Sequence, residues 1–140
     1  ERLWAALTRV GADGWVRRLD DGLDTVVGGH GHQLDAMAAQ QLALARIELL
    51  DPEVVILDEA TADAGSAGAG ELERSAAAVL QGRSALIIAH RLSQAAAADR
   101  ILHLENGRVT ESGSHAELVA AGGPYSRIWA AWSRGREAGR

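Results

Sequence analysis

The stretch VVILDEAT, residues 54–61, decides the fold class of this 140-residue chain. Its four apolar residues run directly into two adjacent carboxylates, Asp58 and Glu59. A short β-branched apolar run of this kind predicts a strand, over residues 53–58, that is buried on both faces. Ligands of open α/β sheets bind at the carboxyl ends of the strands, which makes the two acids candidate site residues. One acid could hold a hydrated Mg²⁺ while the other orients or deprotonates a water. The alternative is that both simply end the strand and face solvent.

Helical and strand patterns alternate on both sides of this stretch. Upstream, we expect helices over residues 1–10, 14–19 and 35–50, with an irregular glycine-containing connection over 20–33. The apolar stripe of the third helix is expected at Leu34, Ala38, Leu42, Ala45 and Leu49. Downstream, we expect a loop over 61–70, a helix over 71–81, a second buried strand over 84–89 and a short helix near 94–98. This alternation predicts an α/β fold with a largely parallel sheet.

The last third of the chain carries strong local signals. Asn106-Gly107 lies between two apolar runs, 100–104 and 108–111, and predicts a β-hairpin. Ser114 and Glu117 have the spacing of a capping box, which predicts a helix up to Ala121. A final helix is expected from Pro124, followed by a frayed, solvated tail.

The composition is that of a globular domain and excludes several kinds of site. The chain is 47% hydrophobic and 24% charged, which is typical of a globular domain, and no apolar run approaches the ~20 residues of a membrane-spanning helix. It has no Cys, which excludes disulfides and thiolate metal sites, and its net charge of -5 argues against nucleic acid as a partner. No secretory leader is visible and the chain does not begin with Met, so we expect a piece of something longer. All 14 basic residues are Arg, so the chain contains no complete phosphate-binding P-loop, which needs a Lys.

The order of the motifs resembles one family. ALAR at 43–46, VVILDEAT, LIIAHRLS at 86–93 and the closing segment 105–129 follow one another as in the ATP-binding cassette (ABC) transporters, in the C-terminal half of their nucleotide-binding domain. The segment 20–31, DDGLDTVVGGHG, is similar to the loop before the signature motif of exporters with fused transmembrane and ATPase domains. The resemblance implies a P-loop NTPase-like core fragment without its P-loop strand, which belongs between the strands at 84–89 and 100–104. It also implies a helical-subdomain portion over 1–50, the core over 51–134, and a flexible tail over 135–140.

The same resemblance implies roles for the acids and for one histidine. Asp58 would hold Mg²⁺ through its water shell, Glu59 would be the general base that orients the attacking water, and His90 would contact the γ-phosphate of ATP. The intact protein would hydrolyse ATP to drive export, at the cytoplasmic face of the cell membrane. Its partners would be a second nucleotide-binding domain and the transmembrane domains, and the 140 residues alone would be inactive because the P-loop is absent.

Two motifs depart from the family pattern. Where the family signature reads LSGGQ, this chain has Leu34, Asp35, Ala36, Met37 and Ala38. Asp35 is a good N-cap for its helix, but its carboxylate would repel a phosphate, by about 4 kcal/mol at ~4 Å and an effective dielectric of ~20. We interpret the signature as degenerate. The loop that normally reads SALD here runs 62–65, ADAG, in which Asp63 either substitutes for the usual acid or is a plain loop residue.

These departures leave two hypotheses open. The chain belongs to a competent ATPase, or it belongs to a non-catalytic, regulatory half of an asymmetric heterodimer. The intact Asp58, Glu59 and His90 favour the first hypothesis, and the altered signature favours the second.

Overall fold

The computed structural model describes residues 1–58 and 65–137, with side chains omitted at 65–67 and 136–137. The chain divides into two units, Glu1–Ile88 and Ala89–Arg140. The first unit extends past the predicted subdomain boundary between residues 50 and 51, because the strand after residue 51 packs on the helices before it. The subdomain boundary itself stays a prediction.

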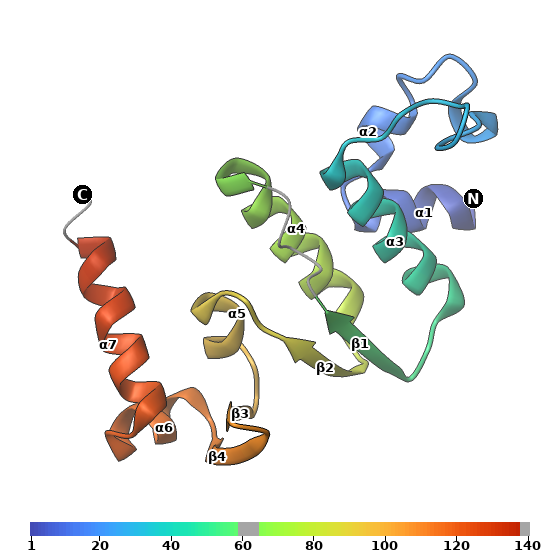
Figure 1. Cartoon of the computed structure of the whole chain (residues 1–140). Helices are drawn as coiled ribbons and strands as arrows, with labels where there is room; N and C mark the ends of the chain where they lie inside the picture. Colours follow the sequence, from blue (N-terminus) through green and yellow to red (C-terminus); the bar gives the residue numbers. More distant parts are fainter. Residues whose placement is uncertain (59–64, 138–140) are drawn as a thin grey trace. The chain divides into compact units, whose positions relative to one another are not determined.

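The first unit begins with helices (Figure 1). α1 spans Arg2–Arg9, α2 spans Asp13–Val16, the 3₁₀ turn η1 spans Gly22–Asp24 and α3 spans Ala36–Leu50. Gly11, with φ of +71°, ends α1 as expected. The second helix, α2, starts one residue earlier and is shorter than the predicted helix over 14–19, with Ala12 at its N-cap.

β1 (Val54–Asp58), α4 (Gly65–Leu80) and β2 (Ser84–Ile88) complete this unit. The predicted loop over 61–70 is wrong for residues 65–70, which form the first turns of α4; residues 61–64 lie outside the described part. Burial explains the difference, because Ala69 and Leu72 are both at most 1% exposed and their packing outweighs the cost of nearby glycines.

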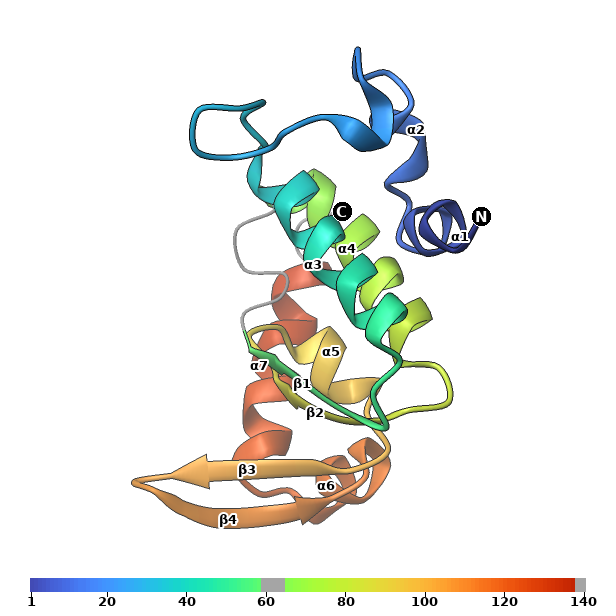
Figure 2. The same cartoon turned by 90° about the vertical axis from the view of Figure 1, so that its right-hand side faces the viewer.

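β1 and β2 pair in parallel, with Val54 opposite Ser84 and Asp58 opposite Ile88. The prediction that the strand over 53–58 is buried on both faces is wrong, and so is the predicted burial of the strand over 84–89, which is mostly exposed. Val55 and Leu57 are buried, whereas Val54 and Ile56 are 63% and 66% exposed. The buried pair packs with residues of α1, α3 and α4, and Figure 2 shows α3 and α4 on one side of these strands. Within the described residues, therefore, only one face of this sheet is covered.

The buried stripe of α3 also differs from the predicted one. Gln41, Leu44 and Ala45 are its buried residues, and Leu42 and Leu49 are only half-buried. The polar Gln41 is fully buried, which apolar periodicity could not indicate.

The second unit contains α5 (Leu92–Ala96), β3 (Ile101–Glu105), β4 (Arg108–Gly113), α6 (His115–Ala121) and α7 (Pro124–Glu137). β3 and β4 form an antiparallel pair around Asn106 and Gly107, whose φ values of 48° and 75° suit a tight hairpin turn. The predicted hairpin is confirmed. Ile101, Leu118 and Tyr125 form the core of this unit, with Trp129 packed against it.

The α/β class is therefore confirmed, and the described strands form one parallel and one antiparallel pair. The segment predicted as a tail from residue 135 is helical up to Glu137, and residues 138–140 lie outside the described part.

The capping box at the start of α6 is present as predicted. The Ser114 backbone N–H donates to Glu117 Oε2 at 2.8 Å, and the Glu117 N–H donates to Ser114 Oγ at 3.3 Å. The hydrogen bond from the Ser114 backbone, followed by that from its hydroxyl, lowers the pKa of Glu117 below its ordinary value. The charged form of Glu117 is thus favoured in the folded state.

This shift predicts a pH dependence of stability. A carboxyl group with a lowered folded pKa contributes stability above its unfolded pKa, and the contribution is lost as the pH falls through the folded value. We expect Glu117→Gln to reduce the loss of stability between about pH 6 and pH 3, because an amide does not titrate. Urea unfolding of both proteins across this range measures the effect. Equal slopes in the two proteins would contradict it.

Candidate functional site

The carboxyl ends of β1 and β2 lie at one edge of the parallel pair. Asp58 is the last residue of β1, stands opposite Ile88 and is exposed. Val55 and Leu57 anchor the strand in the core, so the strand end is held in place while its last carboxylate faces outward. This is the edge at which α/β sheets bind ligands. The position predicted for Asp58 is confirmed.

For the other predicted site residues, only their positions along the chain relative to β1 and β2 can be given. Glu59 follows Asp58 directly, but Glu59 and Asp63 lie outside the described residues. His90 follows β2 after Ala89, is exposed, and belongs to the second unit.

The described side chains at this edge could bind a metal ion only together with a ligand that supplies further donor atoms. Within residues 1–58 and 65–137, no group of three or more His, Asp or Glu side chains could hold a metal ion. Mg²⁺, however, is commonly bound through one or two carboxylates together with water and substrate phosphates. A single exposed Asp58 at a strand end is compatible with that mode.

Asp35 forms the predicted cap at the start of α3. Its Oδ1 accepts a hydrogen bond from the Ala38 backbone N–H at 2.7 Å, and its carbonyl accepts one from Ala39 N–H at 3.0 Å. The carboxylate is exposed, and it occupies an amide that an anion at this helix end would otherwise use. An anionic ligand arriving here would meet a negative side chain first.

Four of the five signature-like residues line one cavity of about 680 Å³. They are Leu34, Asp35, Met37 and Ala38; Ala36 is exposed and is not among the lining residues. The other lining residues include Trp15, Arg18, Gln41 and Glu71, none of which was predicted as a site residue. Apolar periodicity could not indicate the polar Gln41, and nothing in the sequence pointed to Arg18 or Glu71.

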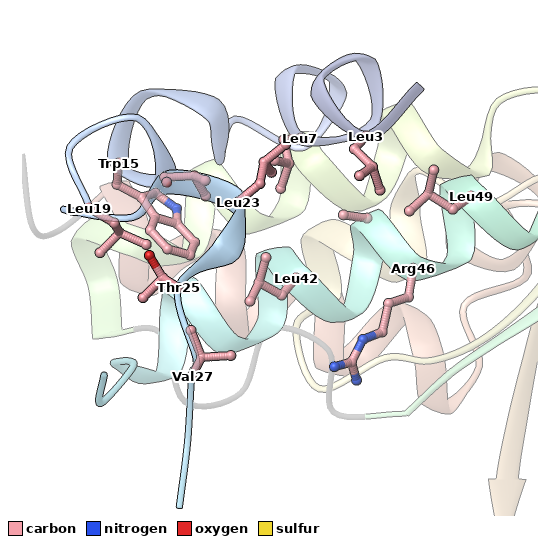
Figure 3. A pocket seen from close by; sticks show the side chains of 13 residues that line it. Leu3, Leu7, Trp15, Leu19, Leu23, Thr25, Val27, Leu42, Arg46 and Leu49 are labelled. Atoms are coloured by element: carbon pink, nitrogen blue, oxygen red, sulfur yellow. The ribbon is translucent and has the colours of Figure 1, made fainter. Parts of the chain in front are cut away.

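A second cavity, of about 250 Å³, is mainly apolar (Figure 3). It lies among α1, α2, the segment around η1 and α3, and the indole of Trp15 forms part of its wall.

Among the described residues, no helix is both long and apolar enough to cross a membrane.

No protein-family model matches the chain. Sequence comparison, in contrast, finds close relatives. The chain is 45% identical over 129 residues to a multidrug efflux ATP-binding/permease protein of Mycobacterium bovis, an alignment that covers 92% of this chain and 11% of that protein. It is 42% identical over 127 residues to an ATP-dependent lipid A-core flippase of Burkholderia orbicola, covering 91% of this chain and 21% of the flippase. The chain belongs to the ABC transporter family.

A solved structure supports this assignment. The structure of a bacterial Atm1-family ABC exporter with ATP bound matches with a TM-score of 0.79 at 34% identity. The match covers 94% of this chain and 23% of the exporter chain. The chain thus spans between about a tenth and a quarter of the length of these ABC transporter relatives.

Proposed function

We propose that the chain is the C-terminal half of the ATP-binding domain of an ABC exporter, and that the whole protein couples ATP hydrolysis to export across a membrane. The observation that carries the proposal is the parallel strand β1, which ends in Asp58 within a chain 45% identical to a multidrug efflux ATP-binding/permease protein. Residues 1–50 would belong to the helical subdomain and residues 51–134 to a P-loop NTPase-like core. The phosphate-binding Lys would come from another segment, because this chain has no Lys.

The residues at the strand ends would divide the chemistry of phosphoryl transfer. Bound Mg²⁺ would neutralise charge on the ATP phosphates. Asp58 would hold the hydrated ion, Glu59 would orient the attacking water and accept its proton, and His90 would donate a hydrogen bond to the γ-phosphate. Asp63 would lie in the loop that meets the second ATP-binding domain.

The partners of this chain would follow from the same role. The start of α3 would contact the nucleotide bound by a second ATP-binding domain, and transmembrane domains would carry the substrate. The site would then lie at the cytoplasmic face of the membrane.

A non-catalytic role is the second candidate, and one observation favours it. The Asp35 carboxylate accepts a hydrogen bond from the Ala38 amide and would place negative charge where the signature motif of the family would meet a phosphate. Because each site of an ABC dimer would combine residues of two chains, Glu59 could be catalytic at one site while Asp35 weakens the other.

The first test of the proposal is ATP hydrolysis by the purified transporter that contains this chain. We expect turnover that requires Mg²⁺ and is abolished by its chelation. A transporter that folds and binds ATP but does not hydrolyse it with Mg²⁺ would overturn the catalytic proposal and leave the regulatory one.

Asp35→Ser tests whether the signature is weakened. Serine keeps an N-cap oxygen for the Ala38 amide, so the helix should lose little stability. Removing the negative charge should raise the apparent ATP affinity of that site by up to about tenfold, which corresponds to about 1.4 kcal/mol. ATP-dependent dimerisation measures the change, and Asp24→Ser, an exposed acid in η1, is the control. If Asp35→Ser leaves affinity unchanged, Asp35 is only a helix cap.

A further inference from the structure

The buried side chain of Gln41, on α3, forms hydrogen bonds with other segments of the first unit. Gln41 is 0% exposed, and its Nε2 donates to the carbonyl oxygens of Val10 at 3.1 Å and Gly11 at 3.3 Å. A Glu71 carboxylate oxygen lies 3.4 Å from the same nitrogen. Gln41 therefore connects α3 to the end of α1 and to α4.

The other end of the amide is also paired. Gln41 Oε1 accepts a hydrogen bond from the indole N–H of Trp15 at 2.9 Å. Both polar ends of the amide are thus satisfied, as a fully buried amide requires. The indole packs against the core and forms part of the wall of the apolar cavity (Figure 3), so the acceptor side of Gln41 is bonded to a partly buried ring.

Gln41 stands close to the start of α3. Met37 and Ala38 lie four and three residues before it, and residues at these spacings share a helix face. Met37 packs against the core, whereas Asp35 and Ala36 are exposed. The first turn of α3 is therefore partly exposed, and the hydrogen bonds of Gln41 lie less than two turns further along the helix.

We propose that Gln41 is a positioning residue, which fixes the first turn of α3 against the end of α1 and against α2 through its hydrogen bonds to Val10, Gly11 and Trp15. The consequence for nucleotide rests on the proposed function. If the first turn of α3 meets the ATP held by a second ATP-binding domain, loosening Gln41 should weaken ATP binding there without slowing the chemical step.

Ser75 provides a matched control on a neighbouring helix. It is 5% exposed, and its hydroxyl donates to the same Val10 carbonyl at 2.8 Å, but it lies on α4, and its hydrogen bonds among the described residues go to Val10 and Glu71 rather than to α3. Loss of its hydrogen bond should cost a stability similar to that of one Gln41 bond. If hydrogen exchange in α3 differs between a Gln41 variant and a Ser75 variant, general destabilisation is therefore not the cause.

The experiment uses the intact transporter with Gln41→Met, Trp15→Phe or Ser75→Ala. Hydrogen exchange is followed at the Ala38 and Ala39 amides, which are bonded to Asp35. We expect Gln41→Met and Trp15→Phe to accelerate exchange about fivefold and Ser75→Ala less than about twofold. Apparent ATP affinity should fall about three- to tenfold in the first two variants, with kcat within about twofold of wild type.

Each result decides the proposal. Equal exchange in all three variants would overturn the positioning role, and Trp15→Phe decides this even if Gln41→Met does not fold. Faster exchange with unchanged ATP affinity would show that Gln41 positions the turn but that the turn does not meet nucleotide. A wild-type transporter that does not respond to ATP would count against the proposed function alone, because the exchange measurement does not depend on it.

Discussion

Glu59→Gln is expected to slow ATP turnover of the intact transporter by about 10²- to 10⁴-fold. The substitution keeps the size and hydrogen-bonding capacity of the side chain but removes a carboxylate that can accept the proton of the attacking water. ATP binding should remain, because the proposed Mg²⁺ residue, Asp58, is unchanged. Steady-state hydrolysis and nucleotide retention on the same preparation measure the two effects.

The control for this prediction is another acid on the chain. Glu53→Gln alters the exposed residue just before β1 and should leave turnover within about twofold of wild type. Wild-type turnover in Glu59→Gln would show that Glu59 is not the base and would favour the regulatory candidate.

Leu44→Ala is expected to destabilise the fold by about 2–5 kcal/mol. Leu44 is 2% exposed and belongs to the cluster that joins α1, α3, α4 and β1, so the truncation leaves a cavity at the centre of the first unit. Urea unfolding measures the change. Leu50→Ala, which removes the same atoms from a residue 78% exposed at the end of α3, should cost no more than about 0.5 kcal/mol.

A loss below about 1 kcal/mol for Leu44→Ala would contradict the packing described for the first unit. It would mean that α3 does not form the centre of this core.

Features with a local chemical cause were predicted well from the sequence. The turn at Asn106-Gly107 depends on two residues that adopt positive φ, the box at Ser114 and Glu117 depends on two side chains three residues apart, and Asp35 caps the helix that begins at the next residue. In each case the residues that cause the structure are neighbours along the chain. Sequence alone is then sufficient.

Features that depend on tertiary packing were predicted less well. Residues 65–70 contain glycines and suggest a loop, yet they are helical because Ala69 lies in the buried interior. The strand over 54–58 suggested burial on both faces, yet helices cover only one face within the described residues. Apolar periodicity also missed Gln41, since a buried polar residue is revealed only by its partners.

The candidate site shows the same division. The strand end at Asp58 and the helix start at Asp35 are confirmed as positions, because a strand followed by acids and a capped helix have local signatures. The roles of Glu59, Asp63 and His90 stay predictions. They depend on a nucleotide and on a second ATP-binding domain, which no local pattern of this chain supplies.

A structure of the Glu59→Gln transporter with Mg²⁺ and ATP would show where this chain meets the nucleotide. We expect Mg²⁺ in its hydration shell beside Asp58 at the carboxyl end of β1, the γ-phosphate within hydrogen-bonding reach of His90, and the first turn of α3 facing the nucleotide of the second ATP-binding domain. ATP bound away from the carboxyl ends of β1 and β2, with neither Asp58 nor His90 near its phosphates, would contradict it.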